Sequence, residues 1–367
     1  MLNAFLVELN GLFDRRFILA YWAPLFVVLA LAGLGGLAIG QGIAPALAVW
    51  SALDPLLQVI LPLAALIGIT VLAYILQAMT ATLIRMYEGY WPQGLNALML
   101  HAIKEQKARR AALLQKAEKQ AQGTVTEQQT QRAAAARAYR RFYLNYPRKQ
   151  ERVRATRLGN VLTAAEEYAY QVYGLDTSLW WPRMASLLPE TLSGQIDAAL
   201  TPLIALLNLS FLLTLVALLG GPALVLIDLF GASQPWWLFL LVLAGGLLLA
   251  RLCYEAAVTQ AGDYGSLLRV AFDLHRQKIL EAMHIARPDN LREERRLWDA
   301  LNQWVYRYIP PWESRWPLDP SQFPEVENFY YDTHEPPKKP APDKPQRVKP
   351  TLAGSPTLNL HQEKIDE

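Results

Sequence analysis

The stretch from Pro202 to Ile227, PLIALLNLSFLLTLVALLGGPALVLI, contains 26 consecutive residues without a charged side chain. A helix needs about 20 apolar residues to cross the hydrocarbon core of a bilayer, so this stretch predicts a membrane-spanning helix. Two other charge-free stretches, Phe17 to Gly40 and Leu56 to Met79, have 24 residues each and predict two more spans. The fold class that follows is all-α and polytopic.

A fourth stretch is apolar but interrupted. It runs from Trp236 to Ala250, meets Arg251, and continues to Val258. Tryptophan is enriched at bilayer interfaces, and arginine at a helix end can extend its charge to the other interface, so we interpret this stretch as a fourth span. The composition agrees, because only 18% of the residues are charged, against about 25% in soluble domains.

The positions of lysine and arginine predict the topology. The segments 41–55 and 228–235, which connect the spans in pairs, contain no lysine or arginine. Basic residues remain on the cytoplasmic side of a membrane, so we expect two transmembrane hairpins with both termini and the long middle segment in the cytoplasm. We expect a multi-pass membrane protein without signal-peptide cleavage, because the first apolar run exceeds the usual length of a signal-peptide core.

The chain divides into six segments by composition. They are an interfacial N-terminal helix (1–16), a first transmembrane hairpin (17–79), a cytoplasmic helical domain (80–201), a second transmembrane hairpin (202–258), cytoplasmic amphipathic helices (259–309) and a largely disordered proline-rich tail (310–367). The tail holds 12 of the 24 prolines and too little apolar surface to fold.

Within the cytoplasmic domain, two long polar helices are predicted, over 93–122 and 127–145. The capping-box spacing of Thr126 and Gln129 marks the start of the second. A short connection favours an antiparallel pair, so we expect a helical stalk resembling a coiled coil. Pro189 and Glu190 are expected to open a helix that continues into the third span, and helices are expected over 263–285 and 289–308.

The sequence contains few signals of chemistry. It has no P-loop, HExxH or GxSxG pattern, a single cysteine, and five histidines without ligand spacing, so we expect no cofactor, no metal and no enzymatic activity. A net charge of +3 does not indicate nucleic-acid binding. The glycines between Gly33 and Ala38 lie inside a span, where we interpret them as helix-packing positions rather than a phosphate loop. Asn208, also within a span, is interpreted as an interhelical hydrogen-bond donor.

The most distinctive stretch is 156–183, TRLGNVLTAAEEYAYQVYGLDTSLWWPR. On a helix, Glu166 would share a face with Tyr170 and Tyr173, whose phenols could donate to its carboxylate. Burial there would bring Glu166 toward titration near neutral pH. The alternative is a structural polar cluster. We predict an interaction or structural cluster at the bilayer surface, formed by Arg157, Asn160, Glu166, Tyr173, Asp176 and Arg183.

Two blocks of this sequence carry a resemblance. The first comprises TRLGN from Thr156, YGLD from Tyr173 and WPR from Trp181, and the second comprises YG from Tyr264 and FDLHR from Phe272. These blocks resemble a group of bacterial multi-pass membrane proteins with which no activity is associated. The resemblance also includes Glu166 with Tyr168 in the first block and the segment LNLS from Leu207. It covers under a quarter of the chain and implies the four-span layout and a bacterial origin, hence a multi-pass protein of the bacterial inner membrane.

Three functions are compatible with these observations. The first is a non-enzymatic oligomeric scaffold, sensor or pore, in contact with the bilayer, with a further copy of itself, and with a cytoplasmic protein through the stalk or the proline-rich tail. The second is a channel or transporter with a path between the two hairpins. The third is a membrane enzyme acting on lipid headgroups. The scaffold, sensor or pore is favoured, because the spans have packing glycines and no buried charge.

Overall fold

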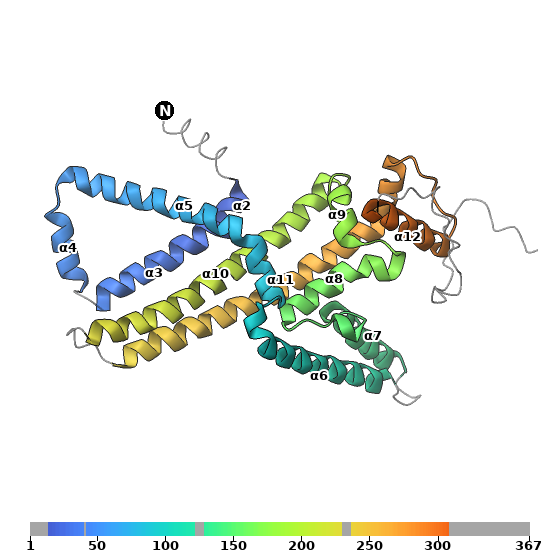
Figure 1. The fold of residues 1–367 in the computed structure, drawn as a ribbon, viewed down its shortest axis with the longest axis horizontal. Helices are drawn as coiled ribbons and strands as arrows, with labels where there is room; N and C mark the ends of the chain where they lie inside the picture. Colours follow the sequence, from blue (N-terminus) through green and yellow to red (C-terminus); the bar gives the residue numbers. More distant parts are fainter. Residues whose placement is uncertain (1–13, 40–41, 122–127, 230–235, 308–367) are drawn as a thin grey trace, which may run out of the picture. The chain divides into compact units, whose positions relative to one another are not determined.

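A computed structural model describes residues 14–39, 42–121, 128–229 and 236–307. Throughout these residues the chain is helical and contains no strand. Figure 1 shows the elements in order. They are α2 (Arg15–Phe17), the π-helix η1 (Ile18–Trp22), α3 (Ala23–Ile39), α4 (Ile43–Ser51), α5 (Pro55–Glu88), the 3-10 helix η2 (Gln93–Leu95), α6 (Asn96–Ala121), α7 (Gln128–Asn145), the 3-10 helix η4 (Gln150–Arg152), α8 (Arg157–Tyr173), α9 (Thr177–Ala185), α10 (Glu190–Leu229), α11 (Trp236–Ala282) and α12 (Leu291–Arg307).

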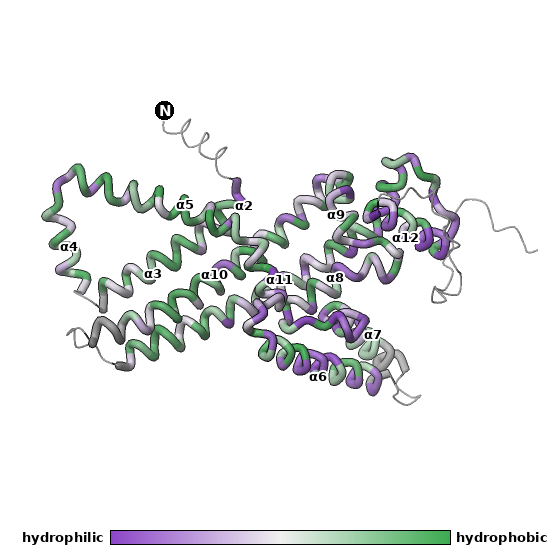
Figure 2. Tube along the Cα trace, in the orientation of Figure 1, coloured by the Kyte–Doolittle hydropathy of each residue, from purple (hydrophilic) through white to green (hydrophobic). Residues whose placement is uncertain are grey.

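Four helices are long and apolar enough to cross a membrane, as the sequence predicts. They lie in α2 to α3, in α5, in α10 and in α11. Figure 2 shows hydrophobic residues along α3, α5 and the adjoining halves of α10 and α11, and hydrophilic residues concentrated on α6, α7 and α12. The all-helical fold and the four apolar helices are therefore confirmed.

Two of these helices, α10 and α11, pack along each other in opposite directions. A Cβ atom on Gly246 would lie 2.8 Å from the Cβ of Ala217, and one on Gly221 would lie 3.3 Å from the ring of Phe239. Further along the pair, the Ser210 hydroxyl donates to the carbonyl of Ala250 at 2.9 Å. Small residues let helix backbones approach closely in lipid, so Gly221 and Gly246 act as helix-packing positions between α10 and α11.

The N-terminal span packs on α10 through a buried polar contact. Asn208 is 1% exposed, and its side-chain amide donates to the carbonyl of Ala20 at 2.8 Å. This confirms Asn208 as an interhelical donor. The Ala20 carbonyl lies in the π-helix η1, an irregular turn of the kind that often occurs at functional positions in helices. By contrast, Gly33, Gly35 and Gly36 in α3 have no atom of the described residues within 4 Å of a Cβ position, so the described part of the chain does not pack closely on them.

Helix α11 differs from the expected arrangement. We expected one helix to end near Val258 and another to begin at 263, because charges appear from Arg251 onward. Instead α11 runs without interruption for 47 residues. Helix α10 also begins at Glu190, as expected, and continues for 40 residues through its span. Both helices thus pass directly from apolar segments into the polar helical region. The segment 41–55 also contains a helix, α4, that was not expected.

The two stalk helices, α6 and α7, lie antiparallel. The Tyr146 hydroxyl, after α7, donates to the side chain of Gln106 on α6 at 3.0 Å. Arg110 on α6 places its guanidinium over the ring of Phe142 at 5.0 Å and donates to the Pro147 carbonyl at 3.3 Å. The boundaries of both helices agree with the sequence prediction to within three residues.

Several predictions fall outside the described residues. They concern the interfacial helix before residue 14, Gly40, the capping box at Thr126, and the chain from residue 308 onward, which includes the proline-rich tail. These stay predictions.

Candidate functional site

The site is built around the first turn of α8, which touches the end of α5. Helix α5 ends at Glu88 and is capped by Gly89, whose φ of +96° suits glycine. The Thr156 hydroxyl donates to the Tyr87 carbonyl at 2.6 Å. A Cβ atom on Gly159 would lie 2.0 Å from the Glu88 carbonyl oxygen. Only glycine allows this approach, and it fixes the second apolar span against α8.

Asn160 holds the loop before α8 in place. Its side chain is fully buried, accepts from the Arg154 backbone N–H at 2.8 Å, and donates to the carbonyls of Arg154 and Thr156 at 3.1 and 2.7 Å. Three bonds satisfy most of the donors and acceptors of one amide. Asn160 therefore has a structural role within the predicted cluster.

Arg157 connects α8 to the charged residues Arg251 and Glu255 of α11. Its guanidinium pairs with Glu255, which also pairs with Arg251 one turn earlier. Beside these residues a groove of about 890 Å³ lies between α5, α6, α8, α10 and α11, the helices that meet near the centre of Figure 1. We call it the interfacial groove. Its walls combine apolar with basic side chains, including Leu95, Leu98, Phe211, Leu247, Arg109, Arg157 and Arg251.

Glu166 lies further along α8 at an exposed position, and the pKa of its carboxyl is raised. Desolvation raises the pKa of its carboxyl to about 7, the nearby carboxylate of Glu88 adds to the rise, and the Arg154 guanidinium opposes it. The expected phenolic partners are absent among the described residues, because the Tyr173 hydroxyl turns to Asp273 and Tyr170 is exposed. The interpretation of Glu166 as an acceptor for these two tyrosines is therefore wrong.

The carboxylate that does bind two tyrosines is Asp273 on α11. It accepts from the Tyr173 hydroxyl at 2.7 Å and from the Tyr168 hydroxyl at 2.9 Å. Burial, together with the hydrogen bond to Asp273, raises the pKa of both phenols, so both stay protonated donors. Asp273 lies in the FDLHR block, but sequence reasoning did not place it in the site.

Next to Asp273, a buried ion pair joins α11 to α12. The Arg276 guanidinium donates from Nε to Oε1 of Glu294 at 2.7 Å and from Nη2 to Oε2 at 3.3 Å. The two side chains are 9% and 0% exposed. Arg276 also donates to the Asp273 carbonyl and lies 3.9 Å above the ring of Tyr173. The indole N–H of Trp298 donates to Glu294 at 3.2 Å.

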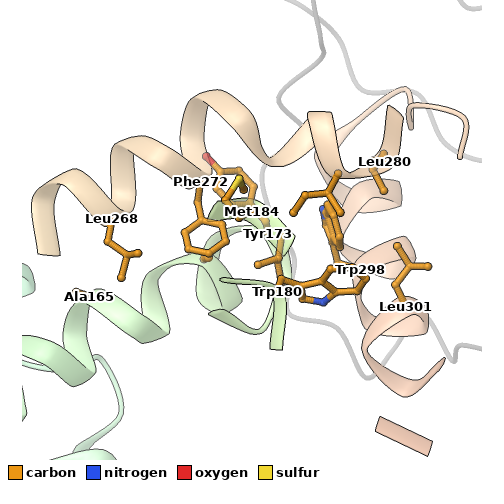
Figure 3. Packing of buried hydrophobic residues seen from close by; sticks show 12 residues of the cluster. Ala165, Tyr173, Trp180, Met184, Leu268, Phe272, Leu280, Trp298 and Leu301 are labelled. Atoms are coloured by element: carbon orange, nitrogen blue, oxygen red, sulfur yellow. The ribbon is translucent and has the colours of Figure 1, made fainter. Parts of the chain in front are cut away.

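An apolar core lies beside this ion pair. Figure 3 shows the buried hydrophobic residues of the core. Trp180 of α9 and Trp298 of α12 are both fully buried and meet edge to face, with ring centroids 5.2 Å apart. Such a pair contributes about 0.5–1.5 kcal/mol beyond its buried area. Phe272 and Leu280 of α11 complete the contact. The core thus joins α8, α9, α11 and α12 into one unit.

The remaining two predicted residues lie on α9. Asp176 caps its N-terminus by accepting from the Ser178 N–H at 3.0 Å, and its other oxygen accepts from the Tyr306 hydroxyl of α12 at 3.0 Å. Arg183 is exposed, donates to the Leu179 carbonyl at 3.0 Å, and lies 5.2 Å from the ring of Trp180.

The six predicted residues therefore do not contact one another as one cluster. Arg157 and Asn160 lie at the start of α8, Tyr173 lies at Asp273, and Asp176 and Arg183 lie at α9, with Glu166 between these places. Two of the six contact α11, since Arg157 pairs with Glu255 and Tyr173 donates to Asp273 and lies beside Arg276. Glu255, Asp273 and Arg276 are charged residues in the long amphipathic stretch that follows the fourth apolar segment. Their presence there is the sequence feature that could have indicated these contacts.

The described ranges contain no group of three His, Cys, Asp or Glu side chains placed to hold a metal ion. The chain matches no family model, no curated protein and no solved structure. Its function is therefore inferred from its own contacts and charges.

Proposed function

We propose that this chain is a multi-pass protein of the bacterial plasma membrane that acts without catalysis, as a homo-oligomeric scaffold or sensor. In this proposal it couples its membrane-spanning helices to a cytoplasmic helical domain. The observation that carries the proposal is the continuity of α11, which extends unbroken from its apolar segment at Trp236 to Ala282. A helix of this kind transmits a shift or rotation because its hydrogen bonds keep it stiff.

Contacts along α11 support the coupling. Glu255 meets Arg157, Gly265 approaches Ala165 so closely that a Cβ would lie 2.8 Å from it, and Asp273 holds two tyrosines of α8. These contacts are spread over five turns of one helix face. A displacement of α11 in the membrane therefore moves α8, and through Arg276 it also moves α12.

The polar groups of the apolar helices support a packed bundle. Asn208 and Ser210 donate to backbone carbonyls of other helices, and the Trp22 indole donates to Thr70 at 3.3 Å. Groups used in this way stabilise helix association in lipid and are not free to line a path for ions. This favours the scaffold or sensor over a channel between the hairpins of a single chain.

Charge and hydropathy support the orientation. The basic residues of α6, α7 and α12 follow the apolar helices, whereas 41–55 contains none. By the positive-inside rule, this pattern indicates two hairpins with both termini in the cytoplasm. The interfacial groove then lies at the cytoplasmic boundary, where its arginines would meet phospholipid headgroups. The row of exposed apolar side chains on α5 faces lipid or a second copy of the chain.

The coupling is tested by amide hydrogen exchange of the full chain in nanodiscs made of short-chain or long-chain phosphatidylcholine. A change in bilayer thickness tilts or shifts spanning helices. We expect the protection of α8, α9 and α12 to differ between the two bilayers. The double substitution Thr259→Gly and Gln260→Gly lowers the stability of the α11 helix between the membrane and the domain, since glycine costs a helix up to about 1 kcal/mol per residue. A more flexible α11 should reduce the difference in protection between the two bilayers.

The matched control is Glu281→Gly with Ala282→Gly, at the last two residues of the same helix. Because these glycines lie beyond the contacts with α8, the bilayer-dependent difference in α8 should persist. Equal protection of the native chain in both bilayers, or an undiminished difference in the Thr259/Gln260 variant, would contradict the coupling.

A further inference from the structure

A second cavity lies between the stalk and the helices it adjoins. Its volume is about 310 Å³, at the lower end of the range for small-molecule sites. We call it the Arg269 cavity. Its wall is formed by the end of α7 and the loop after it, by α8, and by one turn of α11. The lining residues that matter here are Arg140, Arg148, Arg269, Tyr143, Tyr146 and Tyr168.

The wall of this cavity is basic and aromatic. Three arginines line it, and no aspartate or glutamate does. The Arg148 guanidinium lies 5.4 Å from the ring of Tyr143, and that of Arg269 lies 5.8 Å from the ring of Tyr168. Within the described part of the chain, neither these two arginines nor Arg140 forms an ion pair. Aromatic rings therefore lie beside two of the three positive charges, and the Asp273 carboxylate also interacts electrostatically with Arg269 without forming an ion pair among the described residues.

Arg269 has an unsatisfied donor. Its Nη2 atom is shielded from solvent and has no hydrogen-bond partner among the described residues. Buried polar atoms are nearly always paired, and an unpaired charged donor is more costly than a neutral one. Asp273 lies one turn along α11, but its carboxylate accepts from Tyr168 and Tyr173. Because no water-sized space adjoins this nitrogen, an anion in the cavity would pair with it only once the Arg269 side chain turns toward the cavity.

We propose that the Arg269 cavity binds a small soluble anion that carries phosphate groups. The planar guanidinium matches the oxygens of phosphate in a two-point contact, and three such groups suit a ligand with more than one negative charge. The tyrosine hydroxyls and rings can contact the rest of the ligand. A ligand held by Arg140 and Arg148 together with Arg269 ties the end of the stalk to α11.

The position along α11 favours a soluble ligand over a lipid headgroup. Arg269 follows Val258, the last residue of the fourth apolar stretch, by 11 residues. At 1.5 Å per residue this places it about 16 Å further along the helix axis. The headgroup region on one side of a bilayer is only about 5–8 Å thick. The cavity is therefore beyond the reach of the headgroups on a helix that leaves the membrane steeply.

The test is a calorimetric titration of the purified full chain, in phosphatidylcholine nanodiscs at low ionic strength, with inorganic pyrophosphate. We expect saturable binding that weakens as salt is added. Arg269→Met should weaken it at least about tenfold, because a hydrogen bond to a charged group is worth roughly that factor. Arg148→Met, an exposed position that leaves the fold intact, should also weaken it.

The matched control is Arg141→Met, on α7 beside Arg140 but outside the cavity lining. It should bind pyrophosphate like the native chain. No saturable binding, an equal loss in Arg141→Met, or binding that phosphatidic acid in the nanodisc fully abolishes would overturn the proposal. The idea that the ligand acts on the stalk rests on the proposed coupling through α11. The binding measured by the titration does not depend on that coupling. Failure of the exchange experiment with intact binding would therefore contradict the coupling alone.

Discussion

Replacing Arg276 by methionine is expected to lower the free energy of unfolding by about 3–5 kcal/mol, because Glu294 would then be a buried charge without a partner. The carboxylate is fully buried and would keep only the indole N–H of Trp298. Adding Glu294→Leu to the same chain should recover much of the loss, since an apolar pair removes the desolvation cost. Thermal unfolding of the detergent-solubilised protein, followed by near-ultraviolet circular dichroism, measures both variants.

The control for this prediction is Arg109→Met. Arg109 pairs with Glu105 one turn away on α6, but the two side chains are 50% and 54% exposed. An exposed pair of this kind contributes about 0.3–0.5 kcal/mol, so the variant should unfold almost as the native chain does. If Arg276→Met matched Arg109→Met, or if the double variant were less stable than Arg276→Met alone, the buried pair would not have the role assigned to it.

The second large effect is expected at Gly159. A methyl group there would lie 2.0 Å from the Glu88 carbonyl oxygen and 2.8 Å from its carbon, atoms of the backbone that cannot move without separating α5 from α8. Gly159→Ala should therefore lower the free energy of unfolding by at least about 1–3 kcal/mol, the usual cost of overpacking. The same unfolding measurement reports it.

Gly194→Ala is the natural comparison, because Gly194 lies in the helical interior of α10 with no atom within 4 Å of its Cβ position. Alanine favours a helix over glycine by roughly 0.5–1 kcal/mol, so this variant should be slightly more stable. The two substitutions thus have opposite expected signs. Equal effects, or a stabilised Gly159→Ala chain, would show that the close contact of α5 and α8 is not formed.

The positions of the four apolar helices could be predicted because a membrane-spanning helix has one dominant requirement, a long run without charge. The start of α10 at Glu190 could be predicted because Pro189 suits the N-terminal edge of a helix. The same reliance on charge-free runs wrongly predicted a break within α11, which is continuous from Trp236 to Ala282. Arg251 and Glu255 end the apolar run, but they pair with each other one turn apart and do not interrupt backbone hydrogen bonds.

The candidate site could be predicted only in part. Periodicity correctly places Glu166 and Tyr173 on α8, but it cannot say which side chain of another helix meets them. That depends on how α8 crosses α11, which is set by the close approach of Gly265 and Ala165. Asp273 and Glu294 were missed for this reason, since their partners lie 100 residues and 18 residues away in the sequence.

The central claim is that four apolar helices cross the membrane and leave the stalk in the cytoplasm. Cysteine labelling tests it directly, in a chain whose only cysteine is removed by Cys253→Ser. One exposed position on α6, Lys116→Cys, and one on α4, Ser51→Cys, are treated in intact cells with a maleimide that does not cross the inner membrane. We predict that the α4 cysteine reacts and that the α6 cysteine reacts only after the cells are opened. Labelling of the α6 cysteine in intact cells would contradict the account.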